Sequence, residues 1–374
     1  MRLLLCCLFF LTMPLFTLGQ NFLYPFPADS YSSSDTNSLF LSIENTNFLK
    51  NNEYFNDYVD GYTKLGFFLR PELTYLLSEG TTLSAGAHML KYSGSDRFHQ
   101  VIPVFSLEHK LYSNLGLVMG TLDNRDHHHL IDPVYHFENF LDRNVENGLQ
   151  LLADYGSFRG DLWINWERFI FQGADFREQF ETGVSADARL LGKESRLSLN
   201  LPFQLLVQHK GGQINQSDKP ISTIINASTG LNTKMETDAG LIRSLTLRNQ
   251  YVMYRDVSPQ KLQPYSTGYA WYTSLIMEHP AISLELSYWR AHQFISFSGN
   301  PIFQAYSIKK NRSLHPNREL FAGRLRYSKT YDHLRVLFNV DSYFDPLNHS
   351  MDFGIGLYLM LNTELFLAKS KARD

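Results

Sequence analysis

Connections of two different lengths alternate along most of this sequence, and their alternation restricts the possible folds more than any other feature. The short connections fall at residues 78–80, 111–114, 156–160, 192–194, 279–280 and 330–332. The long connections fall at residues 46–61, 93–99, 122–146, 169–177, 209–222, 256–264, 293–318 and 345–350. Outer-membrane barrels have short turns on one side of the bilayer and longer loops on the other, whereas a soluble sandwich has no reason to sort its connections. The sequence therefore predicts a transmembrane β-barrel.

The segments between these connections alternate polar and apolar residues with the period of two that is typical of strands. About sixteen such segments can be distinguished, each close to the 9–11 residues that a tilted strand needs to cross a bilayer. The longest apolar stripe consists of Leu197, Leu199, Leu201, Phe203, Leu205 and Val207. The prediction is an all-β, antiparallel, up-and-down barrel of about sixteen strands, with fourteen as the alternative because residues 226–241 are ambiguous. An even strand count places both termini in the periplasm, on the side of the short turns.

The N-terminus has the pattern of a secretory signal. A basic residue, Arg2, precedes an apolar run that is too short to span a membrane, and small residues follow near position 19. We expect a signal peptide at residues 1–19, an extended periplasmic leader at 20–37, the barrel at 38–366 and a periplasmic tail at 367–374; a retained N-terminal anchor is the alternative. Both cysteines, Cys6 and Cys7, lie in the signal, so thiol catalysis, disulfides and thiolate zinc sites are excluded from the mature chain.

Composition alone would suggest a soluble protein, because mean hydropathy is -0.24 and aromatic residues make up 14% of the chain. Outer-membrane barrels give the same average, since outward apolar residues alternate with inward polar ones. With a formal net charge of -3, the chain lacks the excess of basic residues that is typical of proteins that bind nucleic acid. The expected partners are therefore outer-membrane lipid and, in one alternative, envelope proteins.

Charged residues on the predicted inward face nearly balance in sign. The basic ones are Arg70, Arg189, Arg196, Arg248, Arg324, Arg326 and Arg335. The acidic ones are Glu72, Glu108, Asp161, Glu167, Glu181, Asp187, Glu285 and Asp341. A strongly selective pore would show a ring of one sign, so these residues predict weak charge selectivity or a closed, salt-bridged interior.

The longest connection that is rich in charge, residues 122–146, is the predicted constriction of the lumen. Its candidate pore residues are Asp123, Arg125, Asp126, Asp132, Glu138, Asp142 and Arg143. The alternative is an ordinary solvated outer loop. Residues 126–129 read Asp126-His127-His128-His129, but adjacent histidines on an extended chain point to opposite sides, so no metal site and no cofactor are predicted.

Two stretches carry a resemblance to a known class of protein. They are Asn144-Val145-Glu146-Asn147-Gly148-Leu149-Gln150 and Asp161-Leu162-Trp163-Ile164-Asn165-Trp166-Glu167. Together with the plan of strands and loops, they resemble outer-membrane barrels of Bacteroidota, which are similar in layout to porins. The resemblance implies an outer-membrane location and passage of solutes, and it supplies no catalytic residues.

Three functions follow from this pattern, and the leading one is a porin-like channel for passive diffusion of small hydrophilic solutes. The first alternative is a closed barrel that serves as a subunit of an outer-membrane assembly or export complex. The second is a barrel enzyme such as a lipase or protease, which needs a nucleophile beside a histidine and a third polar group. Ser84 and His88 share one inward face, but no third group completes the set, so the chain is not expected to be an enzyme.

Overall fold

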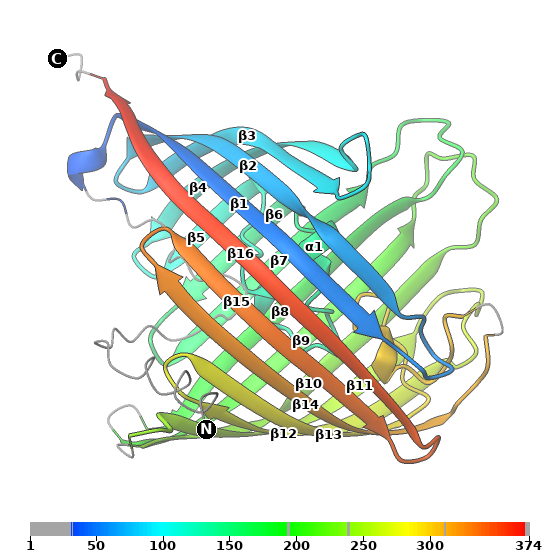
Figure 1. The fold of residues 1–374 in the computed structure, drawn as a ribbon. Helices are drawn as coiled ribbons and strands as arrows, with labels where there is room; N and C mark the ends of the chain where they lie inside the picture. The colour runs from blue at the N-terminus through cyan, green and yellow to red at the C-terminus, as the bar shows by residue number, and fades with distance from the viewer. Residues whose placement is uncertain (1–30, 32, 193–194, 238–239, 310–311, 371–374) are drawn as a thin grey trace.

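The protein is a closed antiparallel barrel of sixteen strands in which each strand pairs with its neighbours in the sequence (Figure 1). The computed structural model describes every residue except 1–30, 32, 193–194, 238–239, 310–311 and 371–374. The strands are β1 Ser38–Glu53, β2 Tyr62–Ser78, β3 Thr81–Tyr92, β4 Gln100–Tyr112, β5 Leu115–Thr121, β6 Asn147–Asp154, β7 Phe158–Arg168, β8 Glu178–Leu191, β9 Leu197–Gly211, β10 Ser222–Glu236, β11 Ser244–Asp256, β12 Thr267–Glu278, β13 Ile282–His292, β14 Asn317–Tyr331, β15 Leu334–Asp345 and β16 Ser350–Lys369. The predicted fold class is confirmed.

The barrel closes between its first and last strands. β1 and β16 pair along their whole shared length, from Ser38 opposite Lys369 to Glu53 opposite Phe353. In Figure 1 they are the blue and red strands that lie side by side. This pairing leaves no open sheet edge, which would otherwise expose unpaired backbone groups.

Side chains along each strand alternate between the outward face and the lumen. In β9, Leu201 and Phe203 point outward, whereas Gln204 and Leu206 are buried inside. Pro202 of this strand cannot donate a ladder hydrogen bond. β9 nevertheless continues through it, and the proline carbonyl accepts a hydrogen bond from Thr229 Oγ1 at 3.0 Å. The predicted apolar stripe therefore covers the outside of the barrel.

One predicted boundary is wrong. Residues 46–61 were expected to form a loop, but β1 continues through Glu53 and pairs with β2 up to the match of Asn52 with Tyr62. The physical reason is that the outward positions Asn47, Asn51 and Glu53 are polar in this segment and Leu49 alone is apolar, so the strand alternation is too weak to recognise. Only residues 54–61 form the connection.

Several predicted segment limits fall at or beyond the ends of the described chain. The predicted signal peptide, most of the leader and residues 371–374 lie outside the described residues. β16 continues through Lys369, beyond the predicted end of the barrel at Phe366. No helix in the described part of the chain is long and apolar enough to cross a membrane.

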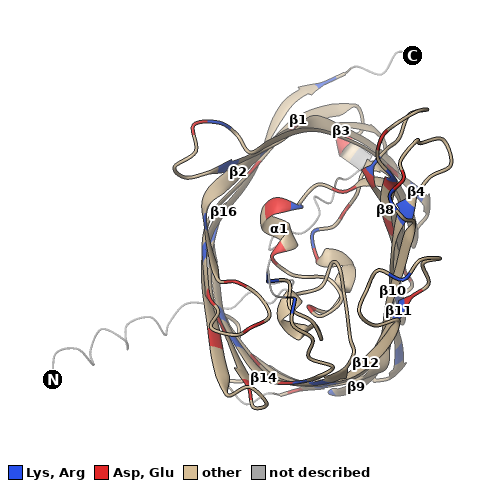
Figure 2. Cartoon of the chain, turned by 90° about the vertical axis from the view of Figure 1, so that its right-hand side faces the viewer, with Lys and Arg blue, Asp and Glu red and all other residues tan. Residues whose placement is uncertain are grey.

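Two long connections fold into the barrel instead of extending away from it. Figure 2 shows them inside the ring of strands, together with the short helix α1. The first, residues 122–146, contains the 3-10 turn η2 His127–His129 and α1 Asn139–Asp142. We call it the plug. The second, described at residues 293–309 and 312–316, contains the 3-10 turn η3 Pro301–Phe303 and is called the second loop.

Candidate functional site

The centre of the lumen is organised around His128 of the plug. Its imidazole is fully buried, with Nδ1 2.7 Å from Asp161 Oδ2 on β7 and Nε2 3.1 Å from Glu146 Oε2. The ring stacks on Trp163 with centroids 3.8 Å apart and planes 5° apart. His128 therefore links the plug to the barrel wall through two carboxylates and an aromatic surface.

The backbone around this histidine adopts an unusual conformation. His127, His128 and His129 have φ values of 54°, 53° and 58°, which lie in the left-handed region. That region costs a residue other than glycine roughly 1–2 kcal/mol. Such a turn persists only where surrounding contacts determine it, and here the buried contacts of His128 do so. On the other side of the stack, Trp163 lies against Gly183, where any Cβ would overlap the indole ring.

The pKa values of this pair are displaced in opposite directions. Burial alone would lower the pKa of His128, but Glu146 and Asp161 raise it to about 10. Burial alone would raise the pKa of Glu146, but His128 and the hydroxyl of Tyr135 lower it to about 2. Both groups are therefore charged across the ordinary range of pH.

This ion pair predicts how the stability of the plug depends on pH. The contribution of Glu146 is complete above its ordinary pKa of 4.5 and is lost as the pH falls through about 2. The contribution of His128 is complete below its ordinary pKa of 6.5 and is lost as the pH rises through about 10. Thermal unfolding followed by heat-modifiable gel mobility should show greatest stability between these two ordinary values. Maximum stability at pH 9 or above would contradict the assignment.

The structure places all seven predicted pore residues inside the barrel and pairs each with another polar side chain. Four of them contact the wall: Asp132 bonds Arg324 at 2.9 Å, Glu138 lies 3.5 Å from Lys50, Asp142 bonds Lys64 at 2.7 Å, and Arg143 contacts Glu167 and Glu181. The other three pair within the plug, Arg125 with Asp123 and Asp126 with His129. The first four therefore hold the plug to the wall, and the role of all seven in solute selection stays a prediction.

The second loop packs on the plug and fills the lumen further. The backbone N–H of Asn300 donates to the Asp132 carbonyl at 2.9 Å, and that of His136 donates to the Ser298 carbonyl at 2.7 Å. An apolar cluster joins both loops to the wall; its members include Val134, Tyr135, Trp163, Leu206, Val252, Trp289, Phe294, Ile295, Ile302 and Phe303. This part of the lumen is thus packed as a protein core.

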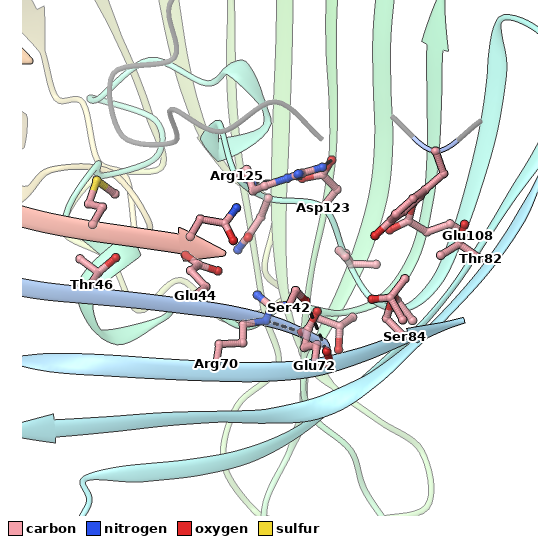
Figure 3. A pocket seen from close by; sticks show the side chains of 18 of the residues that line it. Ser42, Glu44, Thr46, Arg70, Glu72, Thr82, Ser84, Glu108, Asp123 and Arg125 are labelled. Carbon is pink, nitrogen blue, oxygen red and sulfur yellow. Dashed lines mark hydrogen bonds and ion pairs between the residues drawn. The ribbon is translucent and has the colours of Figure 1, made fainter. Parts of the chain in front are cut away.

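Polar cavities lie on both sides of this packed layer. We call the two ends of the barrel the short-turn end and the long-loop end. At the short-turn end lie cavities of about 180 and 490 Å³, and at the long-loop end one of about 580 Å³. Figure 3 shows the smallest, where Arg70 and Glu72 of β2 face Asp123 and Arg125 of the plug.

The structure also places the predicted lumen-lining residues. Eleven of them lie at inward positions of their strands: Arg70, Glu72, Asp161, Glu167, Arg189, Arg248, Glu285, Arg324, Arg326, Arg335 and Asp341. Arg196 precedes β9 at the short-turn end, where it is exposed. Arg248 lies 3.3 Å from Glu285, and Arg324 bonds Asp341. Many of the opposite charges on the inward face are therefore paired with one another.

The inward pair considered for catalysis does not assemble. Ser84 Oγ lies 3.1 Å from Thr74 Oγ1, and the buried His88 Nδ1 has no hydrogen-bond partner among the described residues. In the histidine run, carboxylates hold His128 and His129, whereas the buried His127 Nε2 has no hydrogen-bond partner among the described residues. No group of three His, Cys, Asp or Glu side chains suited to a metal occurs in the described part of the chain.

A second candidate site lies on the outer wall, where sequence reasoning did not look. Asn45, Asn47, Asn51 and Glu53 point outward from β1, and Thr63 points outward from β2; we call this set the outward strip. Thr63 Oγ1 donates to Asn51 Oδ1 at 2.6 Å, and Asn51 Nδ2 donates to Glu53 Oε1 at 2.9 Å. Asn47 Nδ2 donates to Asn45 Oδ1 at 2.6 Å.

The surroundings of the outward strip are apolar. On β16, Leu359 is the partner of Asn47 and Ile355 is the partner of Asn51. Both point outward. Polar side chains on a wall that faces lipid are costly and therefore suggest a functional role. The signal in the sequence was the interruption of the apolar half of the alternation at residues 46–53, where Leu49 is the one outward apolar residue, and this segment was interpreted as a loop.

Comparisons with solved structures identify the fold. OprD from Pseudomonas aeruginosa is 8% identical, with a TM-score of 0.51 over 88% of this chain and 94% of that one. A loop-deletion mutant of OmpT from Vibrio cholerae is 11% identical, with a TM-score of 0.53 over 87% and 100%. OpdR from Pseudomonas aeruginosa is 13% identical, with a TM-score of 0.50 over 92% and 100%. The fold is therefore the porin-like barrel of outer-membrane proteins.

Comparisons with protein families bear on the activity of the chain, whereas the solved structures bear on its fold. The family described as lipid A 3'-O-deacylase-type matches residues 31–370, and no curated protein matches the chain. The expectation that this chain is not an enzyme is therefore wrong, because the family that covers it is named for an enzyme. That expectation considered only inward groups, whereas an enzyme that acts on a membrane lipid can place its polar groups on the outer wall.

Proposed function

This chain belongs to the lipid A 3'-O-deacylase-type family, and on that premise we propose that it hydrolyses an acyl ester of lipid A at the outer face of its barrel. The family match over residues 31–370 is the observation that carries the proposal. The packed lumen supports it as well, because the plug and the second loop fill the middle of the barrel and pack against the wall as a core. A lipid substrate would therefore reach the protein from the side.

The outward strip is the proposed place of this reaction. Glu53 and Thr63 lie at the long-loop end. We propose that this end faces the outside of the cell and that the short turns and both termini face the periplasm, as in other barrels of this plan. Lipid A lies in the outer leaflet, with its ester bonds near the boundary between sugar and acyl chains. Glu53, Asn51 and Thr63 would then lie near the depth of those esters.

The strip contains the groups that ester hydrolysis needs. Glu53 would take a proton from a water molecule as the water oxygen attacks the carbonyl carbon of the ester. The second hydrogen of the Asn51 amide is available to the oxyanion that forms. The bond between the acyl carbon and the sugar oxygen then breaks, and the sugar oxygen takes the proton. The products are a free fatty acid and a lipid A with one acyl chain fewer.

Purified barrel in mixed detergent and lipid A micelles tests this function directly. Mass spectrometry should show loss of one acyl chain from the lipid and the appearance of the matching fatty acid. Folding is checked by heat-modifiable gel mobility in the same preparation. A correctly folded protein that leaves every acyl chain in place at long incubation would overturn the proposal.

Passage of small hydrophilic solutes is a second candidate, favoured by the polar cavities on both sides of the packed layer. These cavities would form the two vestibules of a weakly selective channel, and movement of the plug would join them. Planar-bilayer recordings in symmetric salt test this function. If the folded protein gives no conductance steps, the result would indicate a closed barrel. Recovery of a second envelope protein with it in mild detergent would then support the alternative that the barrel is a subunit of an outer-membrane complex.

A further inference from the structure

We propose that the cavity at the long-loop end of the lumen is a binding site for a neutral oligosaccharide. Its volume of about 580 Å³ lies within the range of about 300–1,000 Å³ that is usual for small-molecule sites. The plug forms its floor, and strands from β4 to β9 form its walls. The proposal does not depend on lipid hydrolysis, because this cavity lies inside the barrel and the outward strip lies on the outer face.

Side-chain amides from several strands line this cavity. Gln100, Asn165, Gln179 and Gln208 project into it from β4, β7, β8 and β9. Gln100 and Gln208 each use one Nε2 hydrogen, on the Asp142 carbonyl and on Glu181 Oε1, and Asn165 Oδ1 accepts from the Asn147 N–H. Gln179 makes no side-chain hydrogen bond within the described part of the chain, so its whole amide is available to a ligand. Amides donate and accept, as sugar hydroxyls do, so Gln179 and the remaining groups of the other three can bind several hydroxyls at once.

The charged groups around the cavity neutralise one another. Arg143 bonds Glu167 and lies 3.6 Å from Glu181, and Asp142 pairs with Lys64. Lys210 also lines the cavity, and its charge acts on the Glu167 carboxylate. Glu146 is held by His128 and by the hydroxyl of Tyr135. Because these ion pairs are complete without a ligand, a charged solute would have to break one of them to gain a partner. The site therefore favours a polar ligand without net charge.

One aromatic side chain completes the chemistry. Phe297 of the second loop lines the cavity and is only partly buried, so part of its ring remains available. The C–H face of a pyranose is apolar and packs well on an aromatic ring. An aromatic surface opposite a set of amides suits a sugar, which has an apolar face and a polar rim. A simple water-filled vestibule would need neither group.

Isothermal titration of the full, folded protein with maltotriose tests the proposal. We expect saturable binding to the wild type. Gln179→Leu and Phe297→Ala should each weaken it by roughly threefold to tenfold, as expected for loss of one hydrogen bond or one packing contact. Asn232→Leu is the matched control, because Asn232 lines the cavity at the short-turn end and its replacement should leave binding unchanged.

Two further measurements separate the outcomes. Trigalacturonic acid, a charged analogue, should bind at least several times more weakly than maltotriose. Glu53→Gln changes the residue proposed for hydrolysis and should retain maltotriose binding. The sugar-binding proposal and the hydrolysis proposal can therefore fail independently. Absence of saturable heat with folded wild type, binding that Gln179→Leu and Phe297→Ala leave unchanged, or stronger binding of the charged analogue would each overturn the assignment.

Discussion

Glu53→Gln should lower the rate of lipid A deacylation by about 100-fold or more, the usual effect of removing a general base. The amide keeps the size of the carboxylate and its place at the end of β1, but it cannot take a proton from water. Asn51 can still donate to the new side-chain oxygen, so the hydrogen-bonded strip should stay assembled. The measurement is the initial rate of fatty acid release from lipid A in mixed micelles.

The matched control for this variant is Glu319→Gln. Glu319 also points outward near the long-loop end, on β14, which β15 and β16 separate from β1, and it accepts a hydrogen bond from Tyr288 Oη at 2.7 Å. This variant should keep the full rate. Thr63→Val should give an intermediate loss, because it leaves Glu53 intact but removes the hydrogen bond that orients Asn51. Equal rates for both glutamine variants would remove Glu53 from the mechanism.

His128→Ala should release the plug and produce conductance steps that are larger than those of the wild type. The replacement leaves Asp161 and Glu146 buried without their shared cation, and breaking a buried ion pair in this way costs about 3–5 kcal/mol. It also removes the stacking partner of Trp163 and the contacts that hold the left-handed turn in place. We then expect the plug to separate from the wall and to become solvated by water. Planar-bilayer recording in symmetric salt measures the effect.

His129→Ala is the control for the plug variant. His129 is half-buried and bonds Asp126 within the plug itself, so its loss leaves the link to the wall intact. We expect conductance close to that of the wild type. Gel mobility distinguishes an opened barrel from an unfolded one, because a folded barrel keeps its heat-modifiable shift. Folded His128→Ala protein with wild-type conductance would show that the other ion pairs hold the plug without this residue.

Much of the barrel could be predicted from the sequence because strand alternation and connection length are local properties. The stripe of leucines in β9 faces outward, and most of the charged residues assigned to the lumen occupy inward positions. The error at residues 46–53 has a clear cause. Alternation identifies a strand only when one face is consistently apolar, and in β1 the outward strip leaves Leu49 as the one apolar outward residue there.

The sequence by itself determined the antiparallel barrel and the orientation of its side chains, and it set residues 122–146 apart as a long, charged connection. Only the tertiary structure decided that His128 lies between Asp161 and Glu146, that the second loop packs on the plug, and that Glu53, Asn51 and Thr63 form one strip. A period of two is set by the backbone of each strand alone. The contacts of a long loop join residues far apart in the chain, and their geometry exists only when the barrel has closed around it.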